Sequence, residues 1–269
     1  MNIKPLSTIA GGLALSLLLT SAAAADNITP STARTISINS MAQNTLSNVR
    51  TEVWYRVRLF ANRSYQISAW PVDHEQGVLA PQVILGLFSD DFGMVPASPV
   101  TVTTGDLEGS PNNNGDTLPS TAVFLPMTTG VYKIRVQGLM GAVSASINVL
   151  VRETTLFSPW TSKAAGFEGF IEIHNNTSAA LSVTLKGFDS LGNLQGAGLT
   201  VNAPPNATIF QTAASIGVPI NVFAGVVLTH NGAFGAVSGN ITTLNGANGL
   251  SFDSPFTPRD GSLQGYPVR

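Results

Sequence analysis

The sequence predicts an all-β protein built from two consecutive antiparallel β-sandwiches that follow a cleaved signal peptide. Short stretches of alternating apolar and polar residues recur at intervals of about 8 to 12 residues, with turn-forming residues between them. Only 10% of the residues are charged, which suits strands whose outer faces carry hydroxyl and amide groups. The 269 residues include no cysteine, so each sandwich must be stabilised by its own hydrophobic core.

The first 25 residues have the pattern of a secretory signal peptide. Lys4 supplies a positive charge, residues 9–20 are apolar, and Ala23 to Ala25 match a small-residue cleavage site. The apolar run is short for a hydrocarbon layer of about 30 Å. We therefore predict an exported bacterial protein, periplasmic or extracellular, with no membrane insertion. Without a cysteine at the cleavage site, a lipid anchor is excluded.

The first sandwich is predicted over residues 26–152 and is organised around the segment from Trp54 to Trp70. Residues 54–59 and 65–69 alternate as two half-buried strands, and residues 61–64 are predicted to join them as a hairpin loop. Residues 83–88 are apolar on both faces, which predicts a strand in the middle of a sheet. Three further strands are predicted, at 121–125, 131–137 and 143–151.

Four spaced patterns in this region occur in one order: Tyr55-x-Val57-x-Leu59, Tyr65-x-Ile67, Leu85-x-Leu87 with Gly93, and Gly130-x-Tyr132-x-Ile134-x-Val136. In this order they resemble the bacterial pre-peptidase C-terminal domain family, over about residues 35–152. The resemblance implies a compact β-sandwich of the kind appended to secreted peptidases and other extracellular enzymes. Some relatives bind collagen or polysaccharide.

The second sandwich is predicted over residues 153–257, and residues 258–269 are predicted to be a loose tail. Residues 157–160 are expected to form an entry loop in which Trp160 packs between the domains, and residues 212–216 a short helix. Strands are predicted at 169–173, 181–186, 199–203, 208–211, 224–229 and 237–244. Their spacing resembles immunoglobulin-like extracellular modules in general, which is an architecture and not a function.

The sequence gives little support for catalysis. The chain has three histidines, His74, His174 and His230, and no G-x-S-x-G motif. His174 and His230 each end a predicted strand before an Asn-containing turn, so we expect both at the wet surface. His74-Glu75 begins an H-E-x-x-H pattern, but Val78 stands where the second zinc ligand belongs.

Calcium is the one metal that the sequence leaves open, because loops rich in Asp, Asn and Glu can supply several oxygen ligands. The alternative is a solvated polar loop without a bound ion. The candidate ligands lie in one polar stretch and are Asp106, Glu108, Asn112, Asn114 and Asp116.

Trp54, Arg56 and Arg58 share one face of a predicted strand and are the candidate ligand-binding residues. A ring and two cations on an exposed face suit a glycan, because sugar CH groups stack on aromatic rings. The alternative is that Trp54 packs into the sandwich while the arginine stems cover apolar surface.

These observations predict a non-catalytic exported module that binds an extracellular or envelope partner, either a polysaccharide or a protein, without a cofactor. With a formal net charge of −2, no basic field recruits nucleic acid. One alternative is a structural or assembly component, or an accessory protein of a secreted peptidase system. The other is a hydrolase whose loops bring two carboxylates together, from Asp90, Asp91, Asp106 and Glu108.

Overall fold

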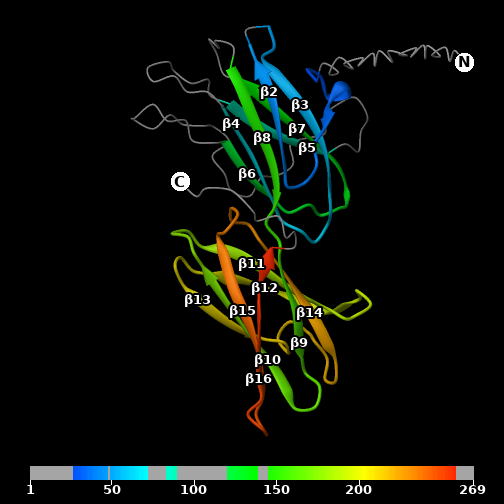
Figure 1. The fold of residues 1–269 in the computed structure, drawn as a ribbon, viewed down its shortest axis with the longest axis vertical. Coiled ribbons are helices and arrows are strands. Elements are labelled where there is room, and N and C mark those ends of the chain that lie inside the picture. The colour runs from blue at the N-terminus through cyan, green and yellow to red at the C-terminus, as the bar shows by residue number, and fades with distance from the viewer. Residues whose placement is uncertain (1–26, 48, 72–82, 90–119, 139–144, 259–269) are drawn as a thin grey trace, which may run out of the picture.

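The computed structural model describes residues 27–47, 49–71, 83–89, 120–138 and 145–258. In these ranges the chain forms strands and a single 3-10 turn, η1, so the all-β prediction is confirmed. The strands make two β-sandwiches, one above the other along the long axis of the molecule (Figure 1). The predicted signal peptide and residues 259–269 lie outside the described residues.

The first sandwich consists of two four-stranded sheets, in the orders β1-β3-β7-β5 and β2-β8-β4-β6. Among the described pairs of this half, β1 and β3 run parallel and the others run antiparallel. The elements are η1 (Pro30–Thr32), β1 (Arg34–Thr35), β2 (Ser40–Leu46), β3 (Glu52–Leu59), β4 (Tyr65–Pro71), β5 (Val83–Ser89), β6 (Ser120–Phe124), β7 (Gly130–Gly138) and β8 (Ala145–Glu153).

The core of this half is formed by the inward residues of the alternating strands. Tyr55, Val57 and Leu59 of β3 and Tyr65 and Ile67 of β4 are all buried in one hydrophobic cluster. Because strand side chains alternate between faces, this alternation alone sends the apolar set inward.

The predicted hairpin between residues 54–59 and 65–69 is wrong, although both strands exist. β3 belongs to one sheet and β4 to the other, so they lie on opposite sides of the core instead of pairing. Residues 60–64 therefore cross from one sheet to the other. Alternation identifies the buried face of a strand, but it does not distinguish a hydrogen-bonded partner from a strand across the core.

Residues 83–88 were predicted to lie in the middle of the sandwich; among the strands that the structure describes, β5 is the last of its sheet. Leu85 and Leu87 face the core and are buried. On the outer face, the ring of Phe88 lies 5.4 Å from the ring of Trp54. The ring of Phe88 on the outer face of β5 is thus in contact with an aromatic ring of the same sheet.

The second sandwich pairs a four-stranded sheet, β13-β10-β15-β16, with a five-stranded sheet, β12-β11-β14-β9-β17. Residues 157–160, predicted as a loop, are part of strand β9, and residues 213–217 form turns in place of the predicted helix. The strands are β9 (Leu156–Ser162), β10 (Phe167–Asn175), β11 (Leu181–Phe188), β12 (Leu194–Ala203), β13 (Thr208–Thr212), β14 (Phe223–His230), β15 (Val237–Asn245), β16 (Ser251–Pro255) and β17 (Thr257–Pro258).

The two sandwiches have separate hydrophobic cores. One cluster of buried side chains spans Ile36 to Val151, and the other spans Leu156 to Phe256. Residues 153–155 connect them, and the surface formed where the two halves meet includes the groove described next.

Candidate binding groove

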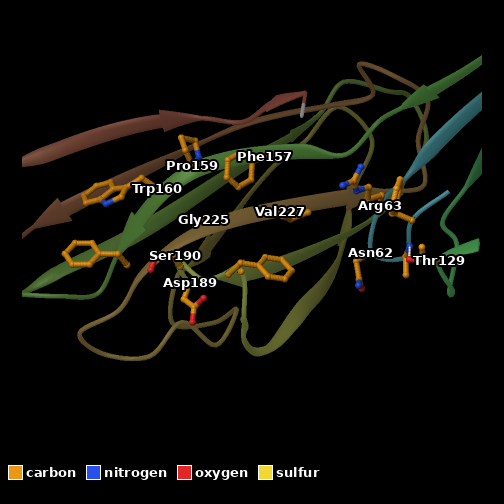
Figure 2. A pocket seen from close by; sticks show the side chains of 16 residues that line it. Asn62, Arg63, Thr129, Phe157, Pro159, Trp160, Asp189, Ser190, Gly225 and Val227 are labelled. Atoms are coloured by element: carbon orange, nitrogen blue, oxygen red, sulfur yellow. Dashed lines mark hydrogen bonds between the residues drawn. The ribbon is translucent and has the colours of Figure 1, made fainter. Parts of the chain in front are cut away.

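A groove of about 670 Å³ lies on the outer face of the five-stranded sheet, next to the junction with the first sandwich. Figure 2 shows Phe157, Pro159 and Trp160 along one side, with Asp189 and Ser190 opposite them. The far end is formed by the first sandwich. The lining residues from the first sandwich are Phe60 to Arg63, in the turn that crosses from β3 to β4, and Thr129.

The floor of the groove is a glycine between aromatic rings. On the outer face, Gly225 of β14 pairs with Phe188 of β11, and the neighbouring Val227 pairs with Phe157 of β9. A Cβ atom placed on Gly225 would lie 3.0 Å and 3.1 Å from two ring carbons of Phe157. The lack of a side chain at Gly225 therefore lets the Phe157 ring lie close to the sheet.

A β-bulge presents Trp160 to the groove. Between Ala224 and Val226 the register of β14 with β9 shifts, and β9 holds the extra residue there. Pro159 lies in this bulge, where its missing N–H breaks no regular ladder. Trp160 stacks on Phe223, with ring centroids 6.2 Å apart and planes 28° apart. It also makes an edge contact with Phe252, at 5.5 Å.

Asp189 supplies the groove's carboxylate, but the turn after β11 uses both of its oxygens. Oδ1 accepts the backbone N–H groups of Leu191 at 2.9 Å and Asn193 at 2.8 Å. Oδ2 accepts the side-chain amides of Asn193 at 3.1 Å and Gln195 at 3.0 Å. The backbone N–H of Asn193 is the main cause that holds the pKa of this carboxyl below its usual value. Asp189 is therefore an ionised turn residue and is poorly suited to act as a base.

The turn from the first sandwich is fixed by contacts to both halves. The Ala61 N–H donates to Thr129 Oγ1 at 2.9 Å, and Lys186 of the second sandwich donates to Asn62 Oδ1. The Arg63 guanidinium lies over the Phe60 ring, 4.6 Å from its centroid, and its Nη1 is 3.0 Å from the Glu153 carboxylate. The charge of Arg63 is thus neutralised by a carboxylate of the same chain.

The connecting residues hold the two halves together beside the groove. The backbone of Thr154 donates to Ser64 O at 2.8 Å, and the Ser64 N–H donates to Thr155 Oγ1 at 2.9 Å. On the other side of the junction, the Phe234 N–H donates to Gln66 Oε1 at 2.7 Å.

His230 also belongs to this junction, and its predicted place at the wet surface is wrong. It is 1% exposed. Nε2 lies 3.1 Å from the Thr154 carbonyl oxygen, and Nδ1 accepts the Gly232 N–H at 3.2 Å, which fits the neutral ring with its proton on Nε2. Burial lowers the pKa of His230 to about 4. His174 is half-exposed on the outer face of β10, with Nδ1 2.9 Å from Thr208 Oγ1.

The predicted ligand-binding residues do not form a glycan platform. Trp54 is 3% exposed, its Nε1 donates to Glu52 Oε1 at 2.9 Å, and Arg135 lies over its ring. Arg56 and Arg58 are exposed, and Arg56 Nε donates to Thr35 Oγ1 at 2.8 Å. The two arginines therefore lie on the surface, while the Trp54 ring is covered and cannot stack on a sugar.

The predicted calcium ligands Asp106, Glu108, Asn112, Asn114 and Asp116 lie outside the described residues, as do His74, Asp90 and Asp91. Among the residues that the structure does describe, no three His, Cys, Asp or Glu side chains are grouped closely enough to hold a metal ion. Within the same ranges, no helix has the length and hydrophobicity needed to cross a bilayer.

The groove's aromatic residues were not among the predicted ligand-binding residues. Phe157 and Trp160 lie in the segment predicted as a loop, and Phe188 and Phe223 lie at the ends of strands. Large aromatic side chains at outward positions of predicted strands are the signal that identifies such a surface, but the alternation of β9 is interrupted by its bulge.

No family model matches the chain, and no curated protein is similar to it in sequence. Among solved structures, the chain is similar to the pre-peptidase C-terminal domain of collagenase from Bacillus anthracis, with 17% identity over 44% of this chain and 93% of that one and a TM-score of 0.31. It is also similar to the full extracellular region of zebrafish Gpr126/Adgrg6, with 12% identity and a TM-score of 0.21. That match covers 82% of this chain but 31% of the zebrafish one. At such TM-scores, the family predicted for residues 35–152 stays a prediction.

Proposed function

We propose that this chain is a non-catalytic, exported binding module that holds a segment of an extracellular polysaccharide in the groove. The observation that carries the proposal is the set of rings around Gly225, formed by Phe157, Trp160, Phe188 and Phe223. Binding sites are concave and largely apolar, with a few polar groups that orient the ligand. The CH faces of sugars stack on such rings.

The charges of the groove favour a neutral polysaccharide over a charged ligand. Arg63 is paired with Glu153, and Asp189 is occupied by its own turn. The remaining polar side chains of the lining are the amide of Asn62 and the hydroxyls of Ser190 and Thr129. Amides and hydroxyls exchange hydrogen bonds with sugar hydroxyls without the cost of desolvating an unpaired charge.

A binding role without catalysis is supported by the state of the titratable groups near the groove. Both nitrogens of His230 are engaged in the junction, and both oxygens of Asp189 are engaged in the turn. General acid–base chemistry requires a group that can reach the substrate and exchange a proton with it. We propose that neither residue does so, and that the groove works without a cofactor or metal ion. Export follows from the predicted signal peptide.

The test is binding of the mature protein to a panel of neutral polysaccharides by affinity electrophoresis, followed by calorimetry with the best polymer. We expect Trp160→Ala and Phe223→Ala each to weaken binding about fivefold to tenfold, as befits one lost stacking contact of about 1 kcal/mol. Phe210→Ala is the matched control, because Phe210 is 68% exposed and lies on the other sheet. The proposal fails if no neutral polymer binds, or if the two groove variants bind like the control.

A further inference from the structure

The outer face of the sheet β13-β10-β15-β16 combines exposed phenyl rings with carboxylates. Phe170 and Phe210 are 44% and 68% exposed. Glu172 pairs directly with Phe210 across the strands and is two residues from Phe170 on the same face of β10. We call Phe170, Glu172 and Phe210 the acidic-aromatic face. The four strands of this sheet contain no lysine or arginine.

Glu172 differs from the other acidic residues of this sheet. Glu168 accepts the Ala214 N–H at 3.2 Å and is 3.7 Å from the Lys163 ammonium. Asp253 accepts the Thr242 hydroxyl at 2.7 Å. Among the described residues, no hydrogen bond or ion pair engages the exposed carboxylate of Glu172, which is available to a cation from outside.

The complementary surface is on the first sandwich of the same protein. Arg56 and Arg58 of β3 are exposed on the outer face of their sheet, and we call them the arginine pair. Arg56 is oriented by its hydrogen bond from Nε to Thr35 Oγ1. The Arg58 guanidinium is 5.8 Å from the centroid of the Phe60 ring.

The spacing of the two surfaces matches. Residues two apart on a strand are separated by about 7 Å, both for Arg56 and Arg58 and for Phe170 and Glu172. When two such faces meet, one guanidinium can pair with the Glu172 carboxylate while the other lies over a phenyl ring. An ion pair and a cation–π contact are the two interactions that arginine makes best at a surface.

We propose that the arginine pair of one copy docks on the acidic-aromatic face of a second copy. The two surfaces belong to different sandwiches of the chain (Figure 1), so the proposed contact pairs two unlike surfaces of neighbouring molecules. It is heterologous, because each copy in a pair keeps one complementary surface free. Such contacts produce short chains of molecules as the concentration rises. This inference goes beyond the polysaccharide groove, because neither the arginine pair nor the acidic-aromatic face lines the groove.

Sedimentation velocity over a concentration series tests the proposal. In about 0.02 M salt we expect the average mass of the wild-type protein to rise with concentration, with a dissociation constant of about 0.1 mM. In about 1 M salt, where the screening length falls to roughly 3 Å, we expect a monomer. A wild-type protein that stays monomeric at low salt overturns the proposal.

Charge reversal identifies the surfaces and separates association from misfolding. Arg56→Glu and Glu172→Lys each place like charges opposite each other, so each variant alone should associate at least about tenfold more weakly. Mixed in equal amounts, the two variants should associate again, because each then meets a surface of opposite charge. Arg34→Glu is the control for Arg56→Glu, since it makes the same change in net charge at an exposed arginine of β1 and should leave association intact.

The proposal is overturned if the mixture stays monomeric, or if both single variants associate like the wild type. It is also overturned if the wild type is monomeric but binds a polyarginine peptide through Glu172, because the occupant is then another cationic chain. Trp160→Ala should keep association, and Arg56→Glu should keep polysaccharide binding. A failure of the groove hypothesis and a failure of this one are therefore distinguishable.

Discussion

The buried imidazole of His230 predicts a loss of stability in mild acid. Burial lowers the pKa of His230 to about 4 from an ordinary 6.5. Between these two pH values the unfolded chain binds a proton that the folded chain does not, so unfolding becomes easier as the pH falls. The contribution of His230 is complete above pH 6.5 and decreases through the interval down to about pH 4.

The magnitude follows from linkage. At about 1.36 kcal/mol per pH unit, the interval from 6.5 to about 4 corresponds to roughly 3 kcal/mol, and about 2 kcal/mol of it is lost by pH 5. The structural cause is the burial of the ring at the junction, where a charged imidazolium would lose its contact with water. In the neutral ring Nδ1 accepts the Gly232 N–H. A protonated ring would point a second donor at this N–H, and its charge would be buried at the junction.

Urea unfolding of the wild type and of His230→Gln at pH 7 and pH 5 measures the effect. Glutamine is neutral at both pH values, so the variant should be less stable at pH 7, yet its deficit should shrink by about 2 kcal/mol at pH 5. Carboxylates that titrate in the same range contribute equally to both proteins and cancel. His174→Gln, at the half-exposed histidine of β10, is the matched control and should keep the wild-type profile.

Parallel pH profiles for the wild type and His230→Gln would refute this reasoning, because they would show that His230 binds its proton equally in the folded and unfolded chains. If the reasoning holds, the ring stays neutral in the folded chain down to about pH 4 and keeps its contacts with Thr154 and Gly232, while the free energy of unfolding falls.

Three further substitutions test the packing around the groove and the first core. Gly225→Ala should displace the Phe157 ring, which lies 3.0 Å from the added carbon, and should therefore weaken polysaccharide binding. In urea titration it should lower the free energy of unfolding by about 1 kcal/mol. Arg63→Met should lower the free energy of unfolding by about 2–3 kcal/mol, because it leaves the 6% exposed Glu153 side chain without its cation. The control is Arg56→Met, at an exposed site, whose free energy of unfolding should be within about 0.5 kcal/mol of the wild type. Trp54→Ala should lower the free energy of unfolding by about 3–4 kcal/mol, measured by thermal or urea unfolding. An unchanged free energy of unfolding would contradict the burial of the Trp54 ring against Arg135 and Phe88.

The sequence predicted the secondary structure class and the inward residues well, because both depend on local alternation. Tyr55, Val57 and Leu59 must share one face of any strand that contains them, and this holds whatever the strand pairs with. The same alternation did not identify which strands pair with each other by hydrogen bonds. β3 and β4 are consecutive and alternate alike, yet they lie in opposite sheets, and β5 is the last of the described strands of its sheet although Phe88 on its outer face is apolar.

The groove depends on tertiary structure because its residues come from distant segments. Phe60 and Arg63, Phe157 and Trp160, Asp189, and Phe223 meet only when two sandwiches and their connection are in place. The burial of His230 has the same origin, since Thr154 of the connection supplies its partner. Local pattern fixes which way a side chain points along its strand. Which groups it then meets is decided by the packing of sheets and halves, where long-range contacts determine burial, charge pairing and pKa.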